Sequence, residues 1–115
     1  TPAGTFTPTF TSTLNLDSTP TATGVWKWSR AGDVITFSGK VSLDPTAAGS
    51  TAFRGTLPVA SNFAASTECN GAVGSSGTDY GDVEGDSVND AFSVGMTVSG
   101  TGSRSAWIIA QYQVI

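Results

Sequence analysis

The sequence lacks histidine altogether and contains a single cysteine, Cys69, among its 115 residues. Without histidine, a Ser-His-Asp triad, a Cys-His pair and a histidine-ligated zinc site are all excluded. One cysteine can form neither an internal disulfide nor a four-cysteine metal site, so Cys69 is expected to be a small buried apolar residue. The Gly-Ser-Ser-Gly run at residues 74–77 is not followed by lysine and is therefore not a phosphate-binding loop.

Charge is also scarce. Charged residues make up 12% of the chain, about half of the ~25% of an average globular protein. The net charge is −4, and the five basic residues are scattered along the sequence. Because binding to nucleic acid requires clustered lysine and arginine, we expect no nucleic-acid partner. No apolar run approaches the ~20 residues of a membrane span, so membrane insertion is not expected either.

Small and hydroxyl-bearing residues are abundant instead, with 17 threonines, 15 serines and 14 glycines. They are spread along the whole chain, and no stretch has apolar residues at helical spacing. Apolar and polar residues alternate with a period of two, which indicates strands. The clearest case is residues 34–43, where apolar residues and one glycine line one face and threonine, serine and lysine line the other.

The segments with this alternation are residues 4–16, 25–30, 34–43, 50–58, 78–86, 91–98 and 105–115. Pro8 cannot donate a backbone hydrogen bond, so the first segment should be an edge strand or contain a bulge. The compact connections at 30–33 and 100–103 predict hairpins. We therefore predict an all-β fold, an antiparallel, jelly-roll-like β-sandwich of seven to eight strands.

The length of the chain bounds its organisation. A chain of 115 residues has room for one domain and not for two independent ones. We predict a single domain over residues 1–115, in which residues 1–18 form an extended, threonine-rich N-terminal strand segment. Such a segment is suited to lie along a neighbouring subunit.

The last predicted strand is apolar on both faces. Trp107, Ile109 and Ile115 share one face, and alanine, isoleucine, tyrosine and valine share the other. A strand with one face in water does not need this pattern. We therefore expect Trp107, Ile109 and Ile115 to lie at an oligomer interface, with Ile115 as the true chain end, because a terminus in an apolar strand is normally tied into a sheet.

Acidic residues gather between Asp79 and Asp90. Within this segment Asp82, Glu84 and Asp86 are two residues apart and would project from one face of a strand. Three neighbouring carboxylates repel one another unless water or a cation screens them. Solvent exposure is the simplest interpretation. A Ca²⁺ site is an alternative, and the only cofactor that the sequence suggests, because calcium prefers oxygen ligands. A catalytic carboxylate pair is a third.

The three tryptophans offer a second kind of candidate site. The flat faces of Trp26, Trp28 and Trp107 could stack on sugar rings as a ligand-binding surface. The alternative is that they fill the core or a subunit interface, where tryptophan is common. Trp26 and Trp28 share a face, so the core would take both if that face points inward.

Several segments together resemble a known family. These are GTFTPTF at residues 4–10, WKWSRAGDVITFSGKVSLDPTAAGST at 26–51, TLPVASNFAAS at 56–66 and the closing QYQVI. They are similar to small β-domains at the C-terminal ends of tail-fibre-like, head-fibre-like and decoration proteins of tailed bacteriophages. The resemblance spans nearly the whole chain. It implies a homotrimer located on the surface of the virion.

Three functional hypotheses follow from the resemblance and the composition. The first is a homotrimeric fibre or head-fibre tip that also binds a glycan receptor on the host cell. The second is a capsid decoration or cement protein that binds other virion proteins. The third is a carbohydrate-binding module of a secreted enzyme. In each case the domain itself is not expected to be an enzyme, because it lacks the bulk to enclose a substrate cleft.

Overall fold

The computed structural model describes residues 3–61, 64–75 and 77–114, and within them the chain is all-β. The strands are β1 (Ala3–Phe6), β2 (Phe10–Leu14), β3 (Thr21–Ala31), β4 (Val34–Leu43), β5 (Gly49–Thr56), β6 (Cys69–Gly74), β7 (Tyr80–Asp86), β8 (Ala91–Val98) and β9 (Arg104–Gln113). A 3₁₀ turn, η1 (Ser66–Glu68), precedes β6. No helix in these residues is long and apolar enough to cross a membrane.

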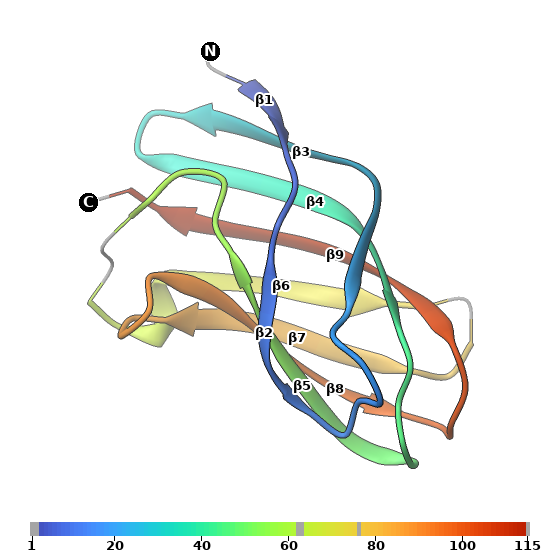
Figure 1. The fold of residues 1–115 in the computed structure, drawn as a ribbon. Helices are drawn as coiled ribbons and strands as arrows, with labels where there is room; N and C mark the ends of the chain where they lie inside the picture. Colours follow the sequence, from blue (N-terminus) through green and yellow to red (C-terminus); the bar gives the residue numbers. More distant parts are fainter. Residues whose placement is uncertain (1–2, 62–63, 76, 115) are drawn as a thin grey trace.

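All pairings between the strands are antiparallel, and the nine strands form one sheet in the order β1-β3-β4-β9-β6-β7-β8-β5-β2. The sheet is strongly curled, and the chain passes directly from β1 at one edge to β2 at the other, across the open side (Figure 1). The two-layer jelly-roll sandwich predicted from the sequence is therefore not confirmed. Each strand is hydrogen-bonded to the next across the whole sheet, from β1 at one edge to β2 at the other.

The structure has nine strands in the described residues rather than the seven to eight predicted. The first predicted strand is divided at Pro8, which lies buried between β1 and β2. Both halves are edge strands, as expected for a segment with proline. The sequence did not predict the additional strand β6, CNGAVG. Its inward face is marked by only two side chains larger than alanine, those of Cys69 and Val73.

The connection at 30–33 is a hairpin turn as predicted, with Gly32 at φ +60°. The prediction of a hairpin at 100–103 is wrong. β8 and β9 do not pair, because the β6–β7 hairpin lies between them in the sheet. A turn sequence allows the chain to reverse, but it does not determine which strand the returning segment pairs with.

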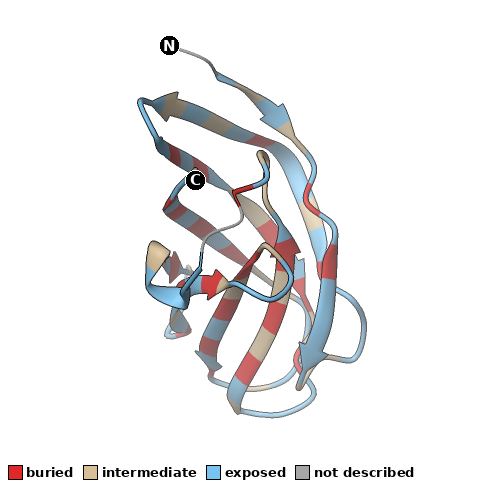
Figure 2. Ribbon diagram, turned by 90° about the vertical axis from the view of Figure 1, so that its left-hand side faces the viewer, coloured by how far each residue is buried: buried red, intermediate tan, exposed pale blue. Residues whose placement is uncertain are grey.

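The core occupies the concave side of the curled sheet. Buried and exposed residues alternate along the strands (Figure 2). In β4 the buried residues are Ile35, Phe37, Val41 and Leu43, as the period of two predicted. Aromatic rings dominate the centre, where Phe92 contacts Phe37 at a centroid distance of 5.0 Å and Trp26 at 6.3 Å.

Two glycines make room for these rings. A Cβ atom added at Gly39 would lie 2.0 Å from Cδ2 of Trp26, and one added at Gly55 would lie 2.3 Å from Cζ of Phe92. The indole and the phenyl ring therefore lie directly against strand backbone. Glycine in a strand interior commonly marks such a close approach.

Candidate functional site

Trp26 and Trp28 both point toward the core. Trp26 is completely buried, and its Nε1 donates a hydrogen bond to the carbonyl oxygen of Lys40 at 3.0 Å. Trp28 is half-buried against the same core, under Gly4 of β1. The buried ring of Trp26 has no face available for a sugar, so the interpretation as a core residue applies to it. Trp28 offers at most part of its ring at the edge of the sheet.

Trp107 points to the opposite, convex side. It is 47% exposed, and Ile109, two residues further along β9, is 56% exposed. The ammonium group of Lys40 lies 5.2 Å from the centroid of the Trp107 ring, a cation–π contact that orders the indole. Ile115, the third predicted interface residue, lies outside the described residues.

The surface around Trp107 and Ile109 is shallow and carries two positive charges, those of Lys27 and Lys40. Ile109 lies between Ser38 of β4 and Ala72 of β6. A shallow groove of about 360 Å³ separates Trp107 from Val25 of β3, which is 64% exposed, with Gly39 at its base. We call this outward-facing side of β3, β4, β9 and β6 the β9 face. It presents Val25, Lys27, Thr36, Ser38, Lys40, Asn70, Ala72, Trp107, Ile109 and Gln111.

The three carboxylates of the predicted calcium site do not form a ligand cluster. Asp82 and Glu84 are exposed on the outer side of β7. Asp86 instead forms an ion pair with Arg54 at 2.8 Å and accepts hydrogen bonds from the backbone N–H groups of Val88 and Asn89. In the described part of the chain, no group of three such side chains is arranged to hold a metal ion.

The electrostatics of Asp86 agree with a structural role in the β7–β8 turn. Burial acts to raise its pKa, but the hydrogen bonds from Asn89 and Arg54 and the positive charge of Arg54 outweigh burial and lower the pKa below its ordinary value. The carboxylate is therefore ionised at neutral pH and held by partners within the chain.

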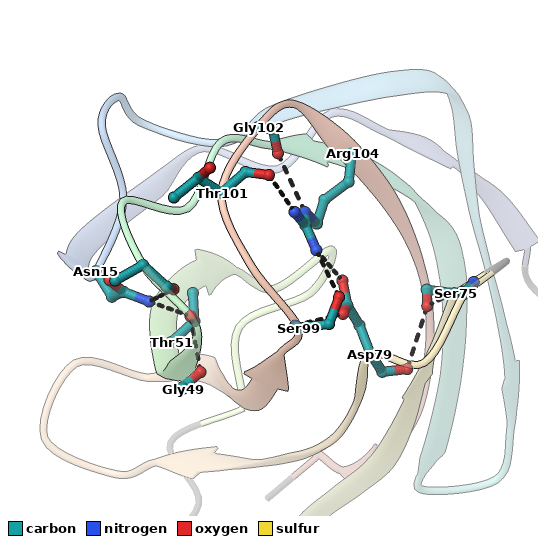
Figure 3. A network of polar contacts seen from close by, with 11 residues as sticks. Asn15, Gly49, Thr51, Ser75, Asp79, Ser99, Thr101, Gly102 and Arg104 are labelled. Atoms are coloured by element: carbon teal, nitrogen blue, oxygen red, sulfur yellow. Dashed lines mark hydrogen bonds and ion pairs between the residues drawn. The ribbon is translucent and has the colours of Figure 1, made fainter.

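A second ion pair joins two loops that the sequence did not connect. Arg104, at the start of β9, contacts Asp79, before β7, at 2.9 Å, and Asp79 also accepts a hydrogen bond from the N–H of Ser99. The same guanidinium donates to the carbonyl oxygens of Thr101 and Gly102 (Figure 3). This network fixes the crossover from β8 to β9 at the end of the sheet.

Burial alone would raise the pKa of Asp79, but the hydrogen bonds from Arg104 and Ser99, with the charge of Arg104, lower it below the ordinary value. Sequence analysis included Asp79 only as a member of the acidic segment. The sequence gives little indication that Asp79 pairs with Arg104, because Arg104 lies 25 residues away along the chain. The pair closes a loop at this end of the sheet.

The other half of the convex side carries a groove of about 450 Å³ that the sequence analysis missed. It crosses β7, β8, β5 and β2, and we call it the Tyr80 groove. Its outward-facing lining residues are Leu14, Ser50, Ala52, Tyr80, Asp82, Gly95 and Thr97. Tyr80 is 65% exposed and shares the outer face of β7 with Asp82. The alternation along β7 was the available signal, but it was used only for the carboxylates.

Cys69, at the start of β6, is buried, and its burial raises the pKa of the thiol to about 12. A thiol with such a pKa is almost entirely protonated at neutral pH, and the protonated form is a poor nucleophile. The expectation that Cys69 is a buried small apolar residue is confirmed.

The comparisons add no relative on which a function could rest. No protein-family model, no curated protein and no solved structure matches the chain.

Proposed function

We propose that the domain is a non-enzymatic surface module of a tailed-phage particle, and that it assembles as a homotrimer through the β9 face. The observation that carries the proposal is the exposure of Trp107 and Ile109 on β9, a strand that is paired along both edges. Large apolar side chains exposed on a rigid surface are typical of protein–protein interfaces.

The state of the reactive groups supports a non-enzymatic role. Asp79 and Asp86 are engaged in ion pairs, and the Cys69 thiol is buried with a raised pKa. The grooves described above lie on the open convex side of the sheet. Binding and assembly require only a surface of this kind, whereas catalysis requires an activated group facing an enclosed substrate.

Homotrimer formation would cover the apolar groups of the β9 face. The cation–π contact with Lys40 holds the Trp107 ring before assembly, so little side-chain entropy is lost when a neighbouring copy covers it. Ser38 and Ala72, on either side of Ile109, are small. Another copy of the sheet can therefore approach Ile109 closely.

The test is the mass of the purified domain in size-exclusion chromatography with light scattering. We expect a trimer for the wild type and a monomer for Ile109→Lys, because lysine places a charge in the centre of the interface. Val88→Lys is the matched control, since Val88 is 90% exposed in the β7–β8 turn, away from the β9 face. This control should remain trimeric. A wild-type monomer, or a trimer unaffected by Ile109→Lys, contradicts the proposal.

The fibre-tip role is our first choice within this proposal, and the decoration role is the alternative. Labelled domain mixed with host cells and, separately, with isolated phage heads distinguishes them. A fibre or head-fibre tip binds the cells. Binding to heads alone would indicate a decoration or cement protein and would contradict the role of a fibre tip. A monomer that binds only polysaccharide would instead support the carbohydrate-binding module.

A further inference from the structure

We propose that the Tyr80 groove is a saccharide-binding site that takes one neutral pyranose ring of a cell-surface glycan. This inference deepens the proposed receptor role, and it rests on the proposed homotrimer only for the gain in avidity from three sites. The groove lies on β7, β8, β5 and β2, while the β9 face lies on the other half of the sheet. The two surfaces adjoin between β6 and β7, where Ala72 lies opposite Asp82, and the floor of the groove lies further away, on β8 and β5.

The floor of the groove is formed by Gly95 of β8 and Ala52 of β5, which lie opposite each other in register. A Cβ atom added at Gly95 would meet only one atom within 4 Å, Oδ1 of Asp82 at 3.7 Å. The space above Gly95 is thus open, in contrast to Gly39, whose missing side chain is replaced by Trp26. A glycine that nothing in the fold requires is consistent with a ligand that approaches the backbone.

Apolar groups stand beside this floor. The Tyr80 ring, 65% exposed, is on one side, and Leu14, 56% exposed, lies opposite Ala52 at the other end. A pyranose ring has an apolar face made of C–H groups, and an exposed aromatic ring is the usual partner for such a face. Tyrosine also provides this surface at low cost in side-chain entropy.

Hydrogen-bonding groups complete the lining. The carboxylate of Asp82 lies near Gly95, and the hydroxyl residues Thr97 and Ser50 are opposite each other in register, next to Tyr80. A carboxylate accepts hydrogen bonds from two adjacent sugar hydroxyls, and each serine or threonine hydroxyl can donate or accept. Hydrogen bonds to an ionised acceptor are roughly twice as strong as those between neutral groups.

The charge of the groove selects among sugars. Neither of the two ion pairs in the described part of the chain involves Asp82. An unneutralised carboxylate repels sialic acids, uronic acids and sulfated sugars and leaves neutral hexopyranoses as the fitting class.

The wall that carries Leu14 is held in place before any ligand binds. β2 changes register between Thr11 and Leu14, and such a bulge redirects the side chains that follow it. Asn15, with φ +62°, donates a hydrogen bond through Nδ2 to Oγ1 of Thr51 at 2.9 Å (Figure 3). It donates another to the carbonyl oxygen of Ala47 at 2.8 Å. The end of β2 is thereby fixed to β5 and to the loop before it, which gives a preformed groove.

The decisive variant is Gly95→Val, because stability and binding should change in opposite directions. Gly95 does not have a positive φ and has space for a side chain, so valine should keep or raise the melting temperature. The same side chain fills the floor and should weaken sugar binding at least tenfold. Ser29→Val is the matched control, because it adds the same side chain at an exposed strand position of β3, near the opposite end of the strand order from β7, β8, β5 and β2. It should leave sugar binding unchanged.

Binding is measured by saturation-transfer NMR with the methyl glycosides of glucose, galactose, mannose and N-acetylglucosamine, and with N-acetylneuraminic acid as the anionic comparison. We expect at least one neutral glycoside to bind at millimolar affinity, and we expect Tyr80→Ala and Asp82→Ala to abolish the signal. No neutral sugar bound, binding of the anionic sugar alone, or equal affinity in Gly95→Val overturns the inference.

Repeating the titration with Ile109→Lys separates this inference from the proposed assembly. If both proposals hold, the monomeric variant keeps the affinity of each site for a monosaccharide and loses the avidity of the trimer on a glycan array. A wild-type monomer that binds sugar in a Gly95-dependent way refutes the homotrimer and leaves the groove intact. A trimer that binds no sugar supports the homotrimer and refutes the saccharide-binding site.

Discussion

Adding one methyl group at Gly39 should remove a large part of the stability of the domain. Gly39 faces the core from β4, and a Cβ atom there would lie 2.0, 2.3 and 2.4 Å from three atoms of the Trp26 indole. Non-bonded carbon atoms are normally about 3.5–4.0 Å apart, so the ring would have to move by roughly 1.5 Å. Gly39→Ala is therefore a test of where Trp26 lies.

The ring has nowhere to move without loss. Trp26 is fully buried, with Phe92 stacked 6.3 Å away and Phe6 and Phe10 at 5.8 and 6.1 Å. Overpacking costs about 1–3 kcal/mol, and breaking the bond from Nε1 to the Lys40 carbonyl leaves a buried donor unsatisfied at about 1–3 kcal/mol. The greater stiffness of alanine returns only about 0.5–1 kcal/mol. The net loss is about 1–5 kcal/mol, within a total stability of about 5–15 kcal/mol.

The assays are urea unfolding, which gives the free energy of unfolding, and thermal unfolding, which gives the melting temperature, both followed by tryptophan fluorescence and near-UV circular dichroism at one protein concentration for all variants. At about 4 °C per kcal/mol, the melting temperature of Gly39→Ala should fall by roughly 4–20 °C. Gly95→Ala is the matched control, since its Cβ atom has only a 3.7 Å contact, and it should gain about 0.5–1 kcal/mol. Equal stabilities of the two variants would refute the packing of Trp26 against Gly39.

Three further predictions concern buried and charged groups. The pKa of Asp79 is lowered from 3.8 in the folded state, so its contribution to stability is present above the unfolded-state pKa and is lost as the pH falls through the folded-state pKa. Asp79→Asn should reduce the free energy of unfolding by about 1–3 kcal/mol at pH 7. The variant should also show a smaller loss of stability between about pH 5 and pH 2 than the wild type in unfolding experiments. Asp86→Ala removes the ion pair with Arg54 and the hydrogen bonds in the β7–β8 turn, and it should lower the free energy of unfolding by about 1–2 kcal/mol. Addition of calcium or of a chelator should leave the melting temperature of the wild type unchanged. A calcium-dependent shift would contradict the assignment of Asp86 to the turn. The Cys69 thiol, with its pKa raised to about 12, should not react with a thiol reagent at pH 8 until urea unfolds the chain, and reaction in the native state would show that the burial is wrong.

The strands themselves were predictable because they depend on local alternation. In β4 and β9 the inward and outward residues are those that the period of two indicated. β6 was not predictable in this way, because a strand with few large side chains differs little from a loop in sequence. Its pairing with β9 and β7 makes it a strand.

The candidate sites show a similar division. The exposure of Trp107 and Ile109 was expected from the apolar outer face of the last strand. The residue type of Trp26 suggested a sugar-binding surface equally well, but its ring instead fills the space beside Gly39, 13 residues further along the chain. Tyr80 was not a candidate from the sequence, because the groove that it lines also depends on Gly95 and Leu14 in other strands.

The sequence by itself determined that the chain is built of strands, which side of each long strand is apolar, and which chemistries are excluded by the lack of histidine. These properties follow from residue types and from the geometry of a single strand. Only the tertiary structure decided the order of the strands, the crossover fixed by Asp79 and Arg104, and the outer surfaces on which grooves form. Each of these depends on contacts between residues far apart in the chain, where close packing selects one arrangement among many that the same local pattern allows.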